Sequence, residues 1–337
     1  MSSTLVRVVF LGLSVVLANS SASAQPSLAS VLAKSPFSAS DLEQLLEGQT
    51  VIQALAEAGT RELAAGAACL ILEGSTSAAL APFVSDRPVL PDEHLLESAV
   101  LSGEPAPELF RGIKLEPSAA AEVARYLEAR PGFALNLSQE EIAEFSALEI
   151  SGRAAENISK VHARLRKLLA ARYGSYRESG LDGIAEYARS TRSSASPAQE
   201  LRASTRASGL DVLAPSFERA WLDYPRGASD RAVSTYFWAR VEVDSRPAVA
   251  LVHRLSLEDG ASHVVGQRTF YLSHYFDSGE SLVAVAPVTE GILFLYQDRI
   301  WLDEASGLSG RVKKALGRRF LQSHVKVTIE KLGVCPG

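Results

Sequence analysis

The sequence predicts an α+β protein in which an antiparallel sheet packs against a long C-terminal helix. Between residues 236 and 300, runs rich in Val, Leu, Phe and Tyr alternate with turn signals such as Asp259-Gly260, the pattern of successive hairpins. Residues 308–332 then repeat apolar side chains at helical spacing. A sheet closed by one helix commonly encloses a cavity, which makes ligand binding the leading hypothesis. The strands are expected at 236–243, 248–257, 263–276, 281–288 and 292–300.

The N-terminal residues have the pattern of a secretory signal peptide. Arg7 precedes the apolar run Val8 to Leu17, and small residues end at Ala22-Ser23-Ala24. The apolar run is shorter than the ~20 residues that span a bilayer. We therefore expect cleavage after Ala24 and a secreted or periplasmic protein without a transmembrane segment. The expected organisation is a signal peptide over 1–24 and one elaborated domain over 25–337.

Composition and linear motifs narrow the functional classes. A hydrophobic content of 47% is ample for a packed core, and a net charge of −5 disfavours non-specific nucleic-acid binding. The sequence has no Gly-x-Ser-x-Gly elbow, no His-Glu-x-x-His helix, no Gly-rich phosphate loop and no Cys-x-x-Cys. Neither a reaction nor a cofactor is therefore predicted from a motif.

Capping and turn residues set the N-terminal elements. Ser40 with Glu43 forms a capping box that begins a short helix, and Gly59-Thr60 separates two β-like runs. Prolines at 88, 91, 105 and 107 argue against a long regular element between the second helix and Pro117. The expected order is strands at 50–55 and 63–72, a helix at 75–84 and an extended loop at 85–117.

A helical region separates this part from the C-terminal hairpins. Pro117 suits the first turn of a helix that Pro131-Gly132 ends. A second capping box, Ser138 with Glu141, begins a long helical stretch in which Gly152 marks a place for a break. The helices are expected at 117–130, 138–173 and 181–189, followed by a flexible connection over 190–209 with a turn of helix after Pro197.

The two cysteines allow two arrangements. Cys69 lies in an apolar strand-like run and Cys335 lies near the C-terminus. In an oxidising compartment they can form a disulfide that holds the C-terminal tail against the sheet. Alternatively, Cys69 is a buried free thiol and Cys335 a solvated one. The sequence leaves both open, because a bridge requires Cα atoms within about 7 Å.

The strand pattern predicts a register. With Asp259-Gly260 at the centre of its turn, His253 lies opposite Gly266, Leu251 opposite Arg268 and Val249 opposite Phe270, and all share one face. The preceding hairpin places Trp238 beside His253, Arg240 beside Leu251 and Glu242 beside Val249. Arg240 and Arg268 then flank Leu251, at a spacing that suits one carboxylate or phosphate. The expected ligand-binding set is Trp238, Arg240, Leu251, His253, Arg268, Phe270, Leu272 and Phe320.

Simpler interpretations stand beside this one. Arg240 can pair with Glu242 or with another acidic residue, and a register slip of one residue turns both arginines outward. A histidine in an apolar row is more often a hydrogen-bonded core residue than a ligand. His253, His263 and His274 cannot converge on a metal in this register, so no metal site is expected. Acid–base chemistry by His253 with Glu242 remains possible, because such sites leave no linear motif.

The C-terminal helix carries an apolar stripe and a basic cluster. The stripe, expected to face the sheet, comprises Val312, Leu316, Phe320, His324 and Val327. The basic residues include Arg311, Lys314 and Arg318, through which the helix can contact an anionic membrane surface. A solvated face is the simpler interpretation of this cluster, and we favour it here.

The order of elements resembles a known superfamily. A strand at 63–72, a helix at 75–84, the antiparallel run from Tyr236 and the final helix resemble the START-like, helix-grip superfamily. The run Arg268 to Phe276 also looks like an uncharacterised family of exported bacterial proteins. The resemblance implies a core at about 50–84 and 234–333, a helical insertion at about 117–222, and a cavity for a lipid-like molecule or, in some members, an enzymatic site. The long insertion and the strand at 50–55 depart from the superfamily pattern.

Three hypotheses follow. The first is an exported protein that binds an apolar or amphipathic small molecule in a cavity between sheet and helix, with Arg240 and Arg268 holding an anionic head. The second is a cavity enzyme that uses His253 with Glu242. The third is a non-catalytic envelope module that docks partners through the helices at 138–173.

Overall fold

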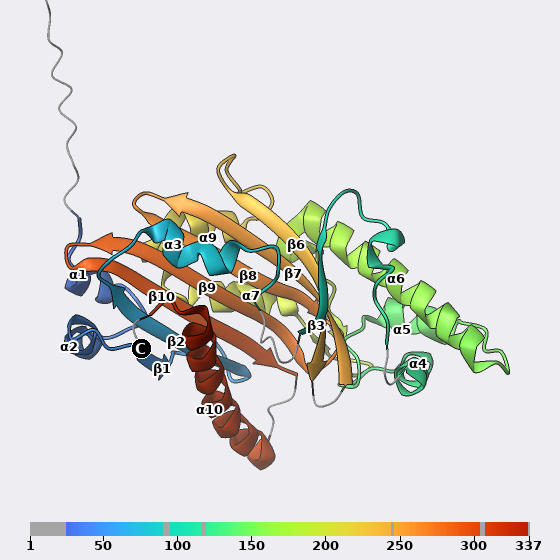
Figure 1. Ribbon diagram of the computed structural model, residues 1–337. Coiled ribbons are helices and arrows are strands. Elements are labelled where there is room, and N and C mark those ends of the chain that lie inside the picture. Colours follow the sequence, from blue (N-terminus) through green and yellow to red (C-terminus); the bar gives the residue numbers. More distant parts are fainter. Residues whose placement is uncertain (1–24, 90–94, 116–118, 244–245, 304–306, 336–337) are drawn as a thin grey trace, which may run out of the picture.

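The computed structural model describes residues 25–89, 95–115, 119–243, 246–303 and 307–335. Within these residues, eight antiparallel strands form one large sheet in the order β1-β2-β10-β9-β8-β7-β6-β3, and helices cover both of its faces (Figure 1). The predicted α+β class, with a large antiparallel sheet and a C-terminal helix, is therefore confirmed. The expected signal peptide lies outside the described residues.

The strands of the large sheet are joined mainly by short hairpins. From β6 onward each strand pairs with the next, and β10 closes the series by pairing with β2 on its other side. The strands are β1 (Val51–Ala54), β2 (Glu62–Ile71), β3 (Leu95–Leu101), β6 (Val233–Val243), β7 (Arg246–Asp259), β8 (Ser262–Leu272), β9 (Phe276–Val288) and β10 (Gly291–Leu302), with β4 (Tyr187–Ala188) and β5 (Ser194–Ala195) forming a separate small hairpin.

Most helices lie between β3 and β6 in sequence, and α10 follows the last strand. The helices are α1 (Leu28–Leu32), α2 (Leu42–Leu46), α3 (Thr76–Leu80), α4 (Ala119–Leu127), α5 (Gln139–Ser146), α6 (Ala154–Ser179), α7 (Pro197–Arg206), α8 (Leu210–Leu213), α9 (Pro215–Leu222) and α10 (Gly307–Leu332). Short 3-10 turns are η1 (Ala39–Asp41), η2 (Ala81–Val84), η3 (Pro107–Phe110) and η4 (Gly180–Gly183).

Local signals placed most elements correctly. The capping box of Ser138 and Glu141 is formed, and the helical stretch breaks around Gly152 between α5 and α6. The expected loop at 85–117 was wrong in part, because it contains β3, an edge strand paired with β6. The prolines lie before and after this strand and do not interrupt it. The connection at 190–209 contains the regular helix α7. α2 begins at Leu42 with Asp41 as its N-cap residue and without a side-chain cap, so the expected capping box of Ser40 and Glu43 was wrong.

Two apolar layers sandwich the sheet. On the α10 face, side chains such as Val283, Phe294 and Tyr296 pack against α3, η2 and α10. On the α9 face, side chains such as Leu255 and Leu282 pack against α8 and α9, and further along this face α6 packs over β6 and β7. Figure 1 shows α3 and α10 in front of the sheet and α7 and α9 behind it.

α10 differs from expectation in the face it buries and in the strands it covers. Leu321, Val325 and Ile329 are its buried residues, whereas the predicted stripe residues Leu316 and Phe320 are exposed. Neighbouring residues lie 100° apart around a helix, so a stripe displaced by one residue faces a different direction. The helix packs on β1, β2 and β10, at the end of the sheet away from β7 and β6. Gly317 permits this approach, since a Cβ there would lie 2.7 Å from Leu63 Cδ1.

The end of α10 is covalently attached to the sheet. Cys69 of β2 and Cys335 form a disulfide with their Cα atoms 5.8 Å apart. This resolves the alternative that the sequence left open. The bridge closes a loop with a sequence separation of 266 residues, and so connects the first long strand to the C-terminus.

Candidate functional site

The residues of the predicted site share a face, but their register differs from expectation. His253 lies opposite Arg268 and Tyr236, and Trp238 lies opposite Leu251. Each pairing is two residues away from the predicted one. Because side chains alternate along a strand, a shift of two residues keeps the face and changes the neighbours. Leu251, His253, Arg268 and Phe270 therefore lie together, but on the face covered by α6 and α9 and not by α10.

Arg240 and Arg268 do not converge. Arg240 pairs with Val249 and Arg268 with His253, which separates them by four residues along β7, about 13 Å, as well as by two strand spacings of about 5 Å each. Arg240 lies 3.6 Å from the Glu97 carboxylate, and Arg268 lies 3.4 Å from that of Glu280. The expected two-arginine grip around Leu251 was wrong.

Arg268 is enclosed by protein groups. Its guanidinium carbon lies 3.9 Å from the centre of the Trp221 ring, and Nη1 donates to Tyr176 Oη and to the Trp221 carbonyl oxygen. Glu280, the partner of Nη2, also accepts hydrogen bonds from Trp221 Nε1 and Thr205 Oγ1. Both charged side chains are fully buried. This arrangement is an internal ion pair in which only Nε of Arg268 lacks a hydrogen-bond partner, so Arg268 is a structural residue.

His253 is likewise a satisfied core residue. Tyr176 Oη lies 2.9 Å from its Nδ1 and Ser234 Oγ lies 3.2 Å from its Nε2. Since Tyr176 Oη already accepts a hydrogen bond from Arg268, its own hydrogen points to Nδ1, and Nε2 donates to Ser234. Burial, with the positive charge of Arg268, lowers the pKa of His253 well below its usual value. The ring is therefore neutral.

The proposed acid–base pair of His253 and Glu242 does not form. Glu242 is exposed and lies opposite Pro247 near the hairpin turn, whereas His253 lies opposite Tyr236. Six residues along the strand correspond to about 20 Å. The two side chains cannot act on one substrate, so this assignment was wrong.

The expected cavity-wall residues do not line one cavity. Leu251 and Phe270 are buried, and the Phe270 ring stacks on Tyr176 with centroids 4.0 Å apart. Leu272 belongs to a different apolar cluster, and Phe320 is exposed on α10. Trp238 packs with the α6 cluster. The register shift and the position of α10 together separate this set.

A different group of residues forms a row across the α10 face. Arg254 pairs with Gln267, Gln267 with Ser281, and Ser281 with Asp298. These four residues lie side by side on β7, β8, β9 and β10, so the Cα atoms of Arg254 and Asp298 are about 14 Å apart. We call them the polar row. The next row on the same face contains Val265, Val283 and Tyr296, with Ser256 of β7 beside Val265.

Arg254 is the cation of the polar row. It is 3% exposed, and its Nη1 and Nη2 donate to the carbonyl oxygens of Ser85 and Arg87. Its guanidinium also lies 4.8 Å from the Phe237 ring, and Nε has no hydrogen-bond partner. Burial lowers the pKa of Arg254 to about 10, and the negative charge of Asp86 offsets only part of this. The neighbouring protein groups thus stabilise the charge incompletely.

The remaining residues of the polar row link it to the elements above. Gln267 forms two hydrogen bonds with the backbone of Val89, each 2.8 Å long. Asp298 accepts a 2.8 Å hydrogen bond from Ser281 and lies 3.4 Å from His324 Nε2 of α10. Burial raises the pKa of Asp298, although His324 and Ser281 act in the opposite direction. Arg254 and Gln267, at one end of the row, therefore bond to the segment after η2, whereas Asp298, at the other end, contacts α10.

A small enclosed cavity lies over the polar row. Arg254, Gln267 and Ser281 line it from the polar row, and Phe83 and Val89 belong to the segment that covers the sheet here; the other lining residues are Val265, Val283 and Tyr296. Its volume is about 10 Å³, enough for about one water molecule. The surface that these residues present to the cavity is apolar, and the cavity is too small for a ligand in this conformation.

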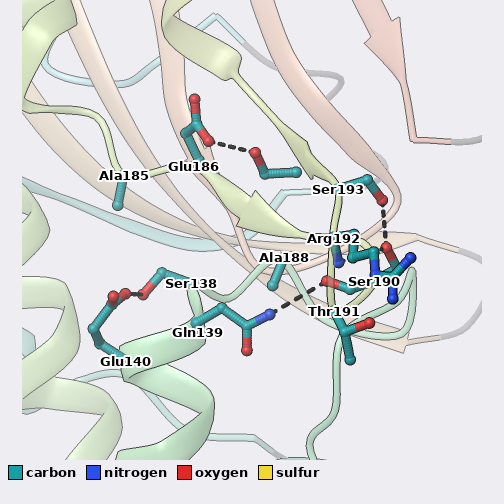
Figure 2. Close-up of a pocket in the computed structure, with 11 residues that line it drawn as sticks. Ser138, Gln139, Glu140, Ala185, Glu186, Ala188, Ser190, Thr191, Arg192 and Ser193 are labelled. Carbon is teal, nitrogen blue, oxygen red and sulfur yellow. Dashed lines mark hydrogen bonds between the residues drawn. The ribbon is translucent and has the colours of Figure 1, made fainter.

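Two larger hollows with many polar groups and a third, more apolar hollow of about 190 Å³ beside Val31, Leu213 and Leu295 also occur among the described residues. The first, of about 330 Å³, is drawn in Figure 2, where hydroxyl groups such as those of Ser138, Ser190 and Ser193 pair with neighbouring side chains. The second, of about 600 Å³, lies beside Arg61, Glu200 and Trp301. Glu200 there bonds to Arg61 and Ser278. In both of these hollows several polar groups already have protein partners.

No protein-family model and no curated protein matches the sequence. In the part of the chain that the structure describes, no group of three or more His, Cys, Asp or Glu side chains could hold a metal ion. In the same residues, no helix combines the length and the apolar composition needed to cross a bilayer.

Sequence reasoning missed the polar row. Arg254 directly follows His253, but its side chain points to the opposite face, and the predicted register placed it opposite Val265 and not Gln267. One glutamine and one serine, each on a different strand from the buried arginine, leave no linear motif in the sequence. Only the correct pairing of three hairpins reveals the row.

Proposed function

We propose that this protein is an exported binding protein for an amphipathic small molecule with an acidic head group. The ligand would bind between the sheet and the segment of α3, η2 and α10, with its head at Arg254. The observation that carries the proposal is the environment of Arg254, a buried guanidinium that has no carboxylate within ion-pair distance among the described residues.

Other buried arginines of the chain show why this matters. Arg268 pairs with Glu280, Arg299 with Glu62 and Arg172 with Glu141. Removing a charge from water costs several kcal/mol unless a counter-charge compensates it. Arg254 instead bonds to two neutral backbone carbonyls of an exposed segment. A carboxylate or phosphate would therefore bind it more strongly than the groups that it contacts now.

The topology is consistent with the helix-grip fold that the sequence resembles. The first long strand, β2, pairs with the last strand, β10, and α3, η2 and α10 all cover the same face of the sheet. This supports a helix-grip core in which β1 and helices α4 to α9 are additions. In that fold the space between sheet and helices is where a ligand binds, and the polar row occupies that space here.

The order of side chains across this face supports an amphipathic ligand. Polar side chains lie in one cross-strand row, and Val265, Val283 and Tyr296 lie in the next. An acidic head at Arg254 would therefore place an apolar tail against aliphatic and aromatic groups. Binding requires the segment from Ser85 to Val89 to move, because its backbone accepts the hydrogen bonds of Arg254 and Gln267.

Export is supported by two independent features. The N-terminal pattern predicts a signal peptide, and the Cys69–Cys335 disulfide is of the kind that forms in oxidising compartments. A secreted or periplasmic binding protein is consistent with both.

Calorimetric titration with dodecanoic acid and its methyl ester tests the proposal. Arg254→Met removes the charge, and loss of a charge-assisted hydrogen bond should weaken the acid about 10- to 100-fold while changing the ester little. Arg254→Lys should retain part of the preference for the acid. Arg240→Met, at the surface pair with Glu97, is the matched control and should change neither affinity.

Two results would overturn the proposal. Equal losses for acid and ester in Arg254→Met would mean that Arg254 acts only through the fold. No binding of either compound to the wild-type protein, with native mass spectrometry also finding no co-purified amphiphile, would remove the ligand-binding function altogether.

A further inference from the structure

The outward side of α10 carries two large apolar side chains. Leu316 is 61% exposed and Phe320 is 60% exposed. They are four residues apart and so lie next to each other on the helix surface. The side that packs on the sheet carries Leu321, Val325 and Ile329 instead. The exposed pair therefore contributes nothing to the core of the described structure.

The same helix concentrates positive charge. Residues 307–332 contain seven Lys or Arg residues and one Glu, whereas the rest of the chain contains 27 Lys or Arg and 38 Asp or Glu. Lys314 and Arg318 are held by Glu57, at 2.7 Å in both cases, on the flank that faces the β1–β2 turn. Arg319, next to Phe320, is exposed. A helix with net charge +6 thus belongs to a protein with net charge −5.

We infer that the outward face of α10, with Leu316, Phe320 and Arg319 at its centre, docks on an anionic phospholipid surface. An interfacial helix binds when apolar side chains enter the boundary between head groups and acyl chains while basic side chains contact the lipid phosphates. The acidic remainder of the protein is repelled by such a surface, so α10 determines the orientation. The simpler interpretation, a solvated basic face opposite a buried stripe, does not account for the exposure of Leu316 and Phe320.

The positive charge of α10 favours an anionic lipid surface over a symmetric contact with a second copy of this protein. In a symmetric dimer formed through this face, a second copy would place one +6 helix against another, which is unfavourable. An anionic bilayer instead complements both the apolar pair and the surrounding charge. Docking in this way goes beyond the proposed ligand binding and does not require Arg254.

Vesicle co-sedimentation tests the inference. The purified protein should bind vesicles of phosphatidylcholine with phosphatidylglycerol, and bind pure phosphatidylcholine vesicles much more weakly. Leu316→Ser with Phe320→Ser should lower the partition coefficient about 100-fold, and Arg319→Glu about tenfold. Ile150→Ser, which changes a side chain that is 67% exposed before α6, is the matched control and should leave binding unchanged.

The outcomes separate the possibilities. Retention of full vesicle binding by the Leu316→Ser, Phe320→Ser protein, or equal loss in Ile150→Ser, would overturn the inference. So would a concentration-dependent dimer that the double variant abolishes, because a second copy would then cover this face. Arg254→Met should bind vesicles like the wild type, which distinguishes failure of docking from failure of ligand binding.

Discussion

Replacing Arg268 by methionine should destabilise the protein strongly, and more at high pH than at low pH. The variant leaves the Glu280 carboxylate fully buried, with hydrogen bonds from Trp221 Nε1 at 2.5 Å and Thr205 Oγ1 at 2.8 Å but without its cation. Breaking a buried ion pair by removing one partner costs about 3–5 kcal/mol in the free energy of unfolding. Methionine fills much of the volume next to Trp221, so the lost charge compensation dominates.

The pH dependence follows from the orphaned carboxylate. Burial already raises the pKa of Glu280, and the positive charge of Arg268 opposes this rise. In Arg268→Met the opposition disappears, so the folded-state pKa rises further above the unfolded value. A group with a raised folded pKa stabilises the folded state when protonated and loses this contribution as the pH rises. The cost of the variant should therefore be smaller near pH 5 than near pH 8.

Urea unfolding, followed by circular dichroism at both pH values, measures the effect. Adding Glu280→Gln to Arg268→Met should recover part of the lost stability, because the buried charge is then absent. Arg240→Met, which disrupts a partly exposed pair at 3.6 Å, should cost less than about 1 kcal/mol. A loss in Arg268→Met as small as that in Arg240→Met would refute the view that Arg268 is structural.

Two further predictions concern the edges of the fold. Burial and then repulsion by Asp277 raise the pKa of Glu200 to about 7, so stability should fall by up to about 1.4 kcal/mol per pH unit between the unfolded pKa, about 4.5, and pH 7. Urea titrations should show that Glu200→Gln removes this slope, and an unchanged slope would contradict the assignment. Cys335→Ser removes the bridge to Cys69 and should lower the free energy of unfolding by about 2–5 kcal/mol, because the closed loop is long. Thermal unfolding should show similar melting temperatures for the variant and for the reduced wild type. An unchanged melting temperature in both would contradict this prediction.

The sequence by itself determined the α+β class and nearly all strands from β6 to β10. The reason is local: hairpins joined by short turns place their strands next to each other, and turn residues such as Asp259-Gly260 fix where each strand ends. It also determined the capping box at Ser138. The strand β3 was missed because it pairs with β6, more than 130 residues away, so its pairing has no local signal.

Only the tertiary structure decided the candidate site. The sheet face on which a strand residue lies depends on parity alone, so the common face of His253 and Arg268 could be predicted. Their neighbours depend on the register, and a turn centre displaced by one residue moved the partner of His253 by two positions, while a β-bulge next to Leu251 moved its partner by three. The polar row of Arg254, Gln267, Ser281 and Asp298 requires three registers to be correct together. The side of the sheet on which α10 packs was equally undetermined, because an amphipathic helix specifies that it must be buried but not which of two apolar faces buries it.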